Sequence, residues 1–452
     1  MTDEQQYIRM TETPIPKLIA SLSAPAVLSM LITAIYNMTD TYFVSKLGTS
    51  AAAAVGVVFA LMSIIQSVGF TVGMGASAYI SRLLGVKDVK AAKEYSASAV
   101  ISSALLGLII GIAGLCFLNP LMRLLGSTET ALPYAADYAK YILIGSPLMC
   151  VVFVFNNILR AEGLSALSMI GIMSGGIINM ILDPVLIFSL DMGISGAALA
   201  TLIGQAASFV ILFIIFFTGK SIVGFSPRSI SKSYKVYLNI LKAGFPTLCR
   251  QGMASVASAL LAIQARVWGD AAIAALTIAN KIYMFIRNLV IGIGQGYQPM
   301  AGYNYGAAKY DRIKKGFWFT AVSGTVICTV SAVLLYTFSD FTVSLFRAGD
   351  AEVIKIGAET LRYLCCVLPV LAYSTYVNQL LQCLGRSKSA AFLASCRQGI
   401  LYIPLLFLLS HLIGLTGLEI TQSAADFLTF LISIPFQIHF FKVVLNKQKQ
   451  TA

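Results

Sequence analysis

Long hydrophobic stretches alternate with short polar segments along almost the whole chain. A membrane-spanning helix needs roughly 20 predominantly apolar residues, and twelve stretches of about this length can be marked in the sequence. They cover residues 18–42, 51–81, 95–119, 134–158, 164–189, 193–217, 239–265, 271–303, 316–339, 356–382, 388–412 and 417–441. Six fall in each half, and the pattern predicts an all-α integral membrane protein with twelve transmembrane helices.

The two halves repeat one another. Gly75 returns as Gly296 and Gly85 as Gly306, each after 221 residues (296 − 75 = 221). Other pairs at this spacing are Pro25 and Pro246, Gly48 and Gly269, Ala51 and Ala272, and Lys93 and Lys314. Duplicated halves in membrane transporters usually hold a binding site between them. Because each copy has an even number of helices, we expect two six-helix lobes related by a pseudo-two-fold axis along the membrane normal.

The polar interruptions predict the domain boundaries. The longest interruption, residues 218–238, is rich in cations and links the two halves. We therefore expect a cytoplasmic N-terminal tail at 1–17, an N-lobe at 18–217, a cytoplasmic linker at 218–238, a C-lobe at 239–441 and a cytoplasmic tail at 442–452.

Composition agrees with a membrane protein and explains the basic charge. The chain is 58% hydrophobic and 11% charged, whereas soluble proteins carry about 25% charged residues. Most of the 32 lysines and arginines lie in segments on one side of the predicted membrane, so the positive-inside rule places both termini in the cytoplasm. The net charge of +13 then needs no nucleic-acid partner. The polar first sixteen residues do not resemble a cleavable signal peptide.

Carboxylates inside apolar helices indicate where an ion could bind. A charge at the centre of a bilayer costs about 2.5–3.5 kcal/mol on insertion scales, yet Asp40 and Asp183 both lie within predicted spans. Asn179 lies one helical turn before Asp183 and shares its face. Pro184 cannot donate a backbone hydrogen bond, so the turn before it should be loosened and leave a carbonyl free. Carboxylate, amide and carbonyl oxygens suit a proton or a small cation, although Asp183 bracing a kinked helix is a structural alternative.

The same residues resemble the multidrug and toxic compound extrusion (MATE) family. The resemblance rests on the Asp40 segment, Asn179-x-x-x-Asp183-Pro184 and the Gly196–Thr201 segment, and the twelve helices extend it over nearly the whole chain. It implies a cation-coupled exporter of organic, often cationic, compounds in a bacterial inner membrane, which works by alternating access and which we expect to be a monomer. The family's N-lobe cation site would fall on Asp40, Asn179, Asp183 and Thr201, with Tyr36 and Asn37 one turn before Asp40.

The C-lobe departs from this pattern. Family members with a C-lobe site carry acids in helices seven, eight or ten, and those helix cores lack them here. Within the repeat, Leu261 and Ile403 take the places of Asp40 and Asp183, and Gln422 takes that of Thr201. We therefore expect a single coupling site in the N-lobe. Asp426, deep in the last helix, should pair with a C-lobe cation, for which Lys281 and Arg287 are the candidates.

Adaptable and aromatic side chains are candidates for substrate contact. Methionine and flat aromatic rings suit varied apolar cations, provided that they face the space between the lobes. The candidates are Met62, Met149, Phe153, Asn156, Met173, Tyr283, Met284, Tyr373 and Tyr376. At any one of these positions, simple packing is the alternative.

The coupling ion can be argued from charge. Two carboxylates close together in an apolar lobe should hold a proton, which a cationic substrate would displace. This competition favours H+ over Na+, although Asp40, Asn179, Asp183 and Thr201 could also hold Na+. We expect no other metal and no cofactor, because the eight cysteines lack metal-ligand or disulfide spacing.

The sequence bears on three other classes of protein. Only two histidines, His411 and His439, are present, and neither has a metal-ligand partner nearby, so we do not expect an enzyme. A channel would also carry polar groups at depth, but the duplication favours alternating access. A flippase for lipid-linked saccharides or another amphipathic lipid is the main alternative, since it would need cations for an anionic head group. The C-lobe has such cations, namely Arg250, Lys281, Arg287 and Arg397.

Overall fold

The computed structural model describes residues 3–346 and 350–445, and in these residues helices are joined by short connections without strands. The N-lobe contains α2 (Ile15–Ser45), α3 (Thr49–Gly85), α4 (Val89–Cys116), α5 (Leu118–Leu124), α6 (Leu132–Ala161), α7 (Ser165–Pro184), the π-helical turn η1 (Val185–Ser189) and α8 (Gly193–Phe217). The C-lobe contains α9 (Tyr234–Ala265), η3 (Arg266–Trp268), α10 (Gly269–Gly306), α11 (Tyr310–Thr337), α12 (Ser339–Ser344), α13 (Ala351–Cys383), α14 (Ser387–Ser395), η4 (Cys396–Ile400), α15 (Tyr402–Ile413), α16 (Leu415–His439) and η5 (Phe440–Leu445). Helix α1 (Asp3–Glu12) precedes the N-lobe, and the short η2 (Pro227–Ser229) lies in the linker.

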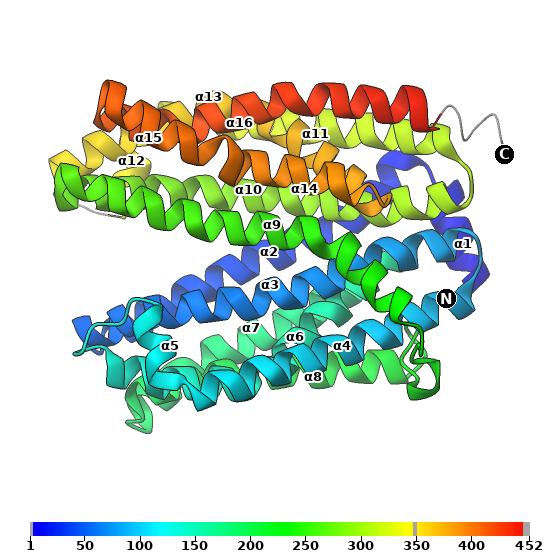
Figure 1. Ribbon diagram of the computed structural model, residues 1–452, viewed down its shortest axis with the longest axis horizontal. Coiled ribbons are helices and arrows are strands. Elements are labelled where there is room, and N and C mark those ends of the chain that lie inside the picture. The colour runs from blue at the N-terminus through cyan, green and yellow to red at the C-terminus, as the bar shows by residue number, and fades with distance from the viewer. Residues whose placement is uncertain (1–2, 347–349, 446–452) are drawn as a thin grey trace.

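Eleven helical segments of the described chain are long and apolar enough to cross a membrane. The twelfth expected span coincides with α9, whose 32 residues run alongside the other long helices in Figure 1. Lys235, Lys242 and Arg250 reduce the hydropathy of α9, which explains why it differs from the others in composition. The span Ser387–Ile413 is divided into α14 and α15 by the π-helical turn η4.

The duplication is visible in the backbone as well as in the sequence. Gly48, which precedes α3, and Gly269, the first residue of α10, both have positive φ angles, 116° and 87°. Lys87 and Ala308, also 221 positions apart (308 − 87 = 221), have φ angles of 63° and 57° although neither is glycine. Residues with a Cβ rarely adopt this conformation, so its repetition shows that the turns after α3 and α10 have the same construction.

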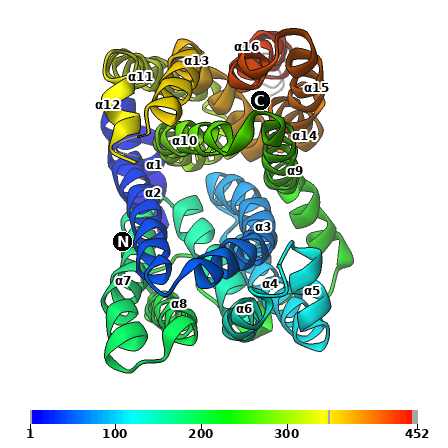
Figure 2. The ribbon, with the colours of Figure 1, turned by 90° about the vertical axis from the view of Figure 1, so that its left-hand side faces the viewer.

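The two lobes approach each other at one end of the molecule and diverge toward the other (Figure 1). Figure 2, viewed from the divergent side, shows them as two separate bundles. We call the end where the C-terminal parts of α3 and α10 meet the closed end, and the opposite end the open end. At and near the closed end, Ser23 Oγ donates to the carbonyl of Ile293 (2.9 Å), and Arg160 Nη1 donates to Gln295 Oε1 (2.6 Å).

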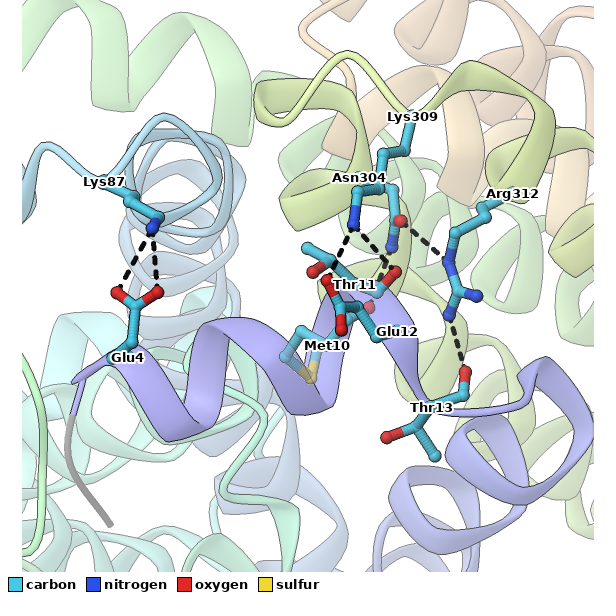
Figure 3. Close-up of polar contacts among 9 residues, drawn as sticks. All are labelled: Glu4, Met10, Thr11, Glu12, Thr13, Lys87, Asn304, Lys309 and Arg312. Atoms are coloured by element: carbon cyan, nitrogen blue, oxygen red, sulfur yellow. Dashed lines mark hydrogen bonds and ion pairs between the residues drawn. The ribbon is translucent and has the colours of Figure 1, made fainter.

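Helix α1 bridges the two lobes at the closed end. Within the cytoplasmic tail predicted at 1–17, residues Asp3–Glu12 form a helix that is docked on the rest of the chain. Figure 3 shows its contacts: Glu4 pairs with Lys87 of the N-lobe (2.9 Å), while Asn304 Nδ2 of the C-lobe donates to the carbonyl of Met10 (3.0 Å). Arg312 Nη2 donates to the carbonyl of Thr13 (2.7 Å). Of the second predicted tail, 442–452, the structure describes only residues up to Leu445, which belong to η5.

Candidate functional site

Three helices of the N-lobe bring the predicted polar residues together. Asp40 comes from α2, Asn179 and Asp183 from α7, and Thr201 from α8. Asn179 and Asp183 lie one turn apart, and the α-helix ends at Pro184 and continues as the π-helical turn η1. A helix irregularity of this kind follows from the missing proline N–H. Asp183, Asn179 and Thr201 are 0%, 4% and 7% exposed, and Asp40 is half-buried.

A hydrogen-bond network joins these four residues. Asn179 Nδ2 donates to Asp183 Oδ1 (3.2 Å) and to Thr201 Oγ1 (3.3 Å). Tyr138 of α6 connects the second carboxylate: its hydroxyl donates to Asp40 Oδ2 and also lies 3.4 Å from Thr201 Oγ1. The two carboxylates are therefore linked through Asn179, Thr201 and Tyr138.

Three oxygens of this network are buried and have no hydrogen-bond partner among the described residues. They are Asp40 Oδ1, Asn179 Oδ1 and Asp183 Oδ2, all of them acceptors. Leaving a buried polar atom unpaired costs about 1–3 kcal/mol. No lysine or arginine of residues 3–346 and 350–445 forms an ion pair with either carboxylate. The network therefore presents negative charge and free acceptors, the chemistry that suits a proton or an oxygen-coordinated cation.

Tyr36 and Asn37 take different places near this network. The Tyr36 ring packs against α7, where a Cβ built on Gly176 would lie 3.0 Å from its Cδ1. The side chain of Asn37 makes no hydrogen bond in the described structure, and its carbonyl accepts one from Thr41 Oγ1 (2.9 Å). Sequence reasoning missed Tyr138, because a tyrosine in an apolar helix carries no spacing signal that distinguishes it from a packing residue.

The equivalent region of the C-lobe has the opposite chemistry. Leu261 and Ile403, at the positions that correspond to the two N-lobe acids, pack against a hydrophobic cluster. Asp426 accepts from Arg397 Nε (2.6 Å) and from the Tyr283 hydroxyl. It therefore has the expected cationic partner. That partner is Arg397, on the π-helical turn η4, and not Lys281 or Arg287.

Comparison with known proteins agrees with this architecture. The sequence model of the MatE family matches residues 25–185 and 246–408, one stretch in each half. The chain belongs to the MATE family. The multidrug export protein MepA of Staphylococcus haemolyticus (strain JCSC1435) is 30% identical over 438 residues, 96% of each chain. MepA of Staphylococcus aureus (strain MSSA476) is 28% identical over 418 residues, 92% of each chain.

Solved structures share the fold over almost the entire chain. A crystal structure of MATE in complex with MaL6 has a TM-score of 0.92 at 24% identity and covers 98% of this chain and 99% of that one. The outward-facing conformation of a multidrug resistance MATE family transporter has a TM-score of 0.91, also at 24% identity, and covers 98% of each chain. The protein is thus an all-α, multi-pass membrane protein of a multidrug efflux transporter family, with two lobes of six spans.

Within this MATE fold, several residues proposed for substrate contact are buried. Met62, Met149 and Tyr376 lie in hydrophobic cores and are 7%, 1% and 0% exposed. Asn156 is also buried; its Oδ1 accepts from Ser168 Oγ (3.0 Å) and ties α6 to α7. Tyr283 is held by Asp426 and Arg397. In this conformation the side chains of these five residues are occupied by contacts within the protein.

The other four candidates are more accessible. Met284 is exposed, and Met173 is half-buried. Phe153 is half-buried beside Phe70, with ring centroids 4.6 Å apart, and the Tyr373 hydroxyl donates to Gln437 Oε1 (3.1 Å). Substrate contact by any of the nine residues is a prediction that needs a bound compound to test it.

Proposed function

We propose that the protein is a secondary active multidrug exporter that exchanges H+, in preference to Na+, for organic and often cationic compounds. The observation that carries this proposal is the buried N-lobe network with three unpartnered acceptor oxygens, on Asp40, Asn179 and Asp183. The names of the MepA relatives supply the class of substrate. The coupling ion is argued from the charges of the network.

The proton and the cationic substrate would compete for the same negative charge, and this competition would couple their movements across the membrane. Asp40 and Asp183 are linked through Tyr138, Thr201 and Asn179, so a proton or cation bound at one carboxylate changes the charge that the other experiences. A cationic substrate near the network favours release of the proton, and a proton favours release of the substrate. If substrate and proton bind different lobe arrangements with different affinity, this competition becomes transport.

The basic residues of the closed end support a membrane orientation. Lys87, Lys309 and Arg312 lie there together with α1, and Arg82 lies there beside Gly306. By the positive-inside rule we assign this end, and both termini, to the cytoplasm. The structure then corresponds to a state open to the outside. Both lobes come from one chain, and we propose that the monomer is the transporting unit in the bacterial inner membrane.

Transport into inverted membrane vesicles tests this function. A fluorescent organic cation is added outside the vesicles, and a proton gradient or a sodium gradient is imposed separately. We expect accumulation with the proton gradient and little with sodium alone. A membrane potential of 100 mV supplies about 2.3 kcal/mol per charge moved, which corresponds to a concentration ratio of about 40 at about 1.4 kcal/mol per decade.

Two outcomes would contradict the proposal in different ways. Accumulation driven only by a sodium gradient would show that the protein is an exporter but that its coupling ion is Na+ and not H+. No gradient-driven transport of a wide panel of organic cations, combined with translocation of a lipid-linked saccharide, would establish the flippase. The C-lobe arginines are the observation in favour of that second candidate.

A further inference from the structure

The C-lobe contains a group of half-buried arginines whose charge exceeds that of Asp426, the carboxylate that lies among them. Arg250 comes from α9, Arg287 from α10 and Arg397 from η4, and Asp426 comes from α16. The charges of Arg250 and Arg397 both act on Arg287, which places the three guanidinium groups within electrostatic range of one another. Together with Asp426, this arginine cluster carries a net charge of +2 (3 − 1).

The carboxylate of Asp426 is already engaged. Its Oδ1 accepts from Arg397 Nε at 2.6 Å, and the Tyr283 hydroxyl donates to its Oδ2. Arg397 Nη2 in turn donates to the Tyr283 hydroxyl (2.9 Å). The side chain of Asp426 is 0% exposed and that of Arg397 is 13% exposed. This closed triad orients Arg397 and leaves Asp426 unable to neutralise a second arginine.

Arg250 and Arg287 lack a partner. Neither forms an ion pair or a hydrogen bond with any residue of the described chain, and Arg287 Nε is buried without an acceptor. Arginine does not lose its proton in proteins. A partly buried charge without a partner is unfavourable, most of all where a donor such as Arg287 Nε is closed off from water. An anion that accepts hydrogen bonds from these guanidinium groups would remove this cost.

Helix α16 adds further donors to the same region. Gln422 lies one turn before Asp426 and so shares its helix face, and its Nε2 is buried without an acceptor. The hydroxyl of Ser423, three residues before Asp426, is also buried and unpartnered. In the sequence repeat Gln422 replaces Thr201. The N-lobe therefore has spare acceptors where the C-lobe has spare donors.

We propose that Arg250, Arg287 and Arg397, with Gln422, form a subsite for an anionic oxygen group, a carboxylate or a phosphate, of an amphiphilic ligand. Arg397 is positioned by Asp426, and the two unpaired arginines supply the charge. The substrates of the exporter would then include zwitterions as well as simple cations. This inference rests on the proposed function only where it concerns transport of the ligand. Binding of the ligand can be measured at equilibrium, without transport.

Two dyes that differ in one negative charge test how much the anionic group contributes to binding. Tetramethylrhodamine carries a free carboxylate, and its methyl ester differs only in having that charge removed. Binding of each dye to the purified full-length protein is followed by fluorescence polarisation. We expect Arg287→Gln to weaken binding of the free acid by about tenfold or more, as expected for loss of a charge-assisted hydrogen bond. Binding of the ester should be unchanged or slightly tighter.

Lys281 provides the control. It lies on the same helix, α10, and is exposed, so Lys281→Gln removes one positive charge without touching the arginine cluster. It should affect both dyes by less than about twofold, as a screened surface charge does. Arg250→Gln gives a second test of the cluster, and retained binding of the ester shows that each variant is folded. Equal losses for acid and ester, or no loss for the acid in either arginine variant, would overturn the proposal.

A competitor distinguishes the two sources of the anionic group. Short-chain phosphatidate, which carries a lipid phosphate, is titrated against bound tetramethylrhodamine. Displacement that depends on Arg287 would support the subsite and assign it to lipid phosphates as well. Loss of acid binding in Arg287→Gln without displacement by phosphatidate would support it as a carboxylate subsite. Normal cation export by a protein that fails both tests would leave the proposed function intact and reject only the subsite.

Discussion

Gly85 and Gly306, which are equivalent positions of the two repeats, contact each other across the interface between the lobes. A Cβ built on Gly85 would lie 3.0 Å from Gly306 Cα and would clash with the carbonyl of Tyr303. A Cβ built on Gly306 would lie 2.8 Å from Gly85 Cα and would clash with the carbonyl of Arg82. Arg82 and Tyr303 are themselves 221 residues apart (303 − 82 = 221). The closed end is thus built around a pseudo-two-fold contact between backbones, for which only glycine is small enough.

Gly85→Ala should therefore open the closed end. The added methyl meets backbone atoms, which cannot rotate away, so the approach of the two lobes is disfavoured. Spin labels on the exposed positions Val86 and Lys315, in a protein with Cys116 and Cys366 replaced, report the separation. We expect a longer and broader distance distribution in the variant.

Gly252→Ala is the matched control for that measurement. A Cβ at this position in α9 meets nothing within 4 Å, and alanine favours a helix over glycine by about 1 kcal/mol. The distance distribution should be unchanged. Equal distributions in Gly85→Ala and the unmodified protein would show that the glycine contact does not hold the lobes together.

Helix α1 should be held by buried hydrogen bonds more than by its exposed ion pair. The side chains of Glu4 and Lys87 are 62% and 52% exposed, and such pairs contribute about 0–1 kcal/mol. Asn304 is fully buried and donates to Met10, and its Oδ1 accepts from Arg312 Nε (3.0 Å). Asn304→Ala leaves these groups unpaired and should cost about 1–3 kcal/mol locally. Hydrogen exchange in α1 should accelerate in Asn304→Ala and change little in Glu4→Gln; the reverse order would contradict this assignment.

Glu162 should make stability depend on pH. It lies between two spans and is fully buried, with its carboxylate accepting from Ser221 Oγ (2.7 Å) and from the backbone N–H groups of Ile222 and Val223. Burial raises the pKa of Glu162 from 4.5 to about 7, although these hydrogen bonds act in the opposite direction. The folded state therefore holds this proton more tightly than the unfolded chain. The contribution of this proton to the free energy of unfolding is fully present below pH 4.5 and is lost as the pH rises through about 7.

The size of this effect is on the order of 3 kcal/mol, because one pKa unit corresponds to about 1.4 kcal/mol. Glu162→Gln stays neutral at every pH and should lack this component. Melting temperatures of both proteins, measured in detergent from pH 4.5 to 8, give the comparison. The unmodified protein should lose stability relative to the variant as the pH rises. Parallel curves would show that Glu162 does not carry the effect.

Asp426 and Arg397 should act on stability and not on coupling to the ion gradient. Removing one partner of a buried ion pair leaves the other uncompensated and costs about 3–5 kcal/mol, so Asp426→Asn should lower the melting temperature. A folded Asp426→Asn protein should still respond to the proton gradient in transport of a simple cation. Loss of that response, with drug binding retained, would place part of the coupling in the C-lobe.

The sequence predicted the lobes and the N-lobe acids because their signals are strong and local. Twelve apolar segments, a fixed repeat and carboxylates at depth each have few physical explanations, and Asn179 and Asp183 share a face by helix geometry alone. Tyr138 and Glu162 were missed because their importance comes from long-range contacts. Glu162 joins a turn to the linker 60 residues away, and nothing in its local sequence indicates burial.

The conformation and the exposure of candidate residues could not be predicted either. Met62 and Met284 look alike in sequence, yet one packs in the N-lobe core and the other is exposed. Helical periodicity does not say which face meets another helix, lipid or the opposite lobe. Docking of α1 depends on Asn304 and Arg312, nearly 300 residues away in the chain.

Proton-driven transport by carboxylate variants tests the central claim most directly. Purified Asp40→Asn and Asp183→Asn proteins are reconstituted into vesicles, and movement of a fluorescent cation is followed with and without a proton gradient. Asp137→Asn is the control, since this exposed carboxylate pairs with Lys140 (3.0 Å) outside the network. We predict that both network variants remain folded and lose uphill transport, whereas the control keeps it. Normal gradient-driven transport in both network variants would contradict the assignment of the coupling ion to this site.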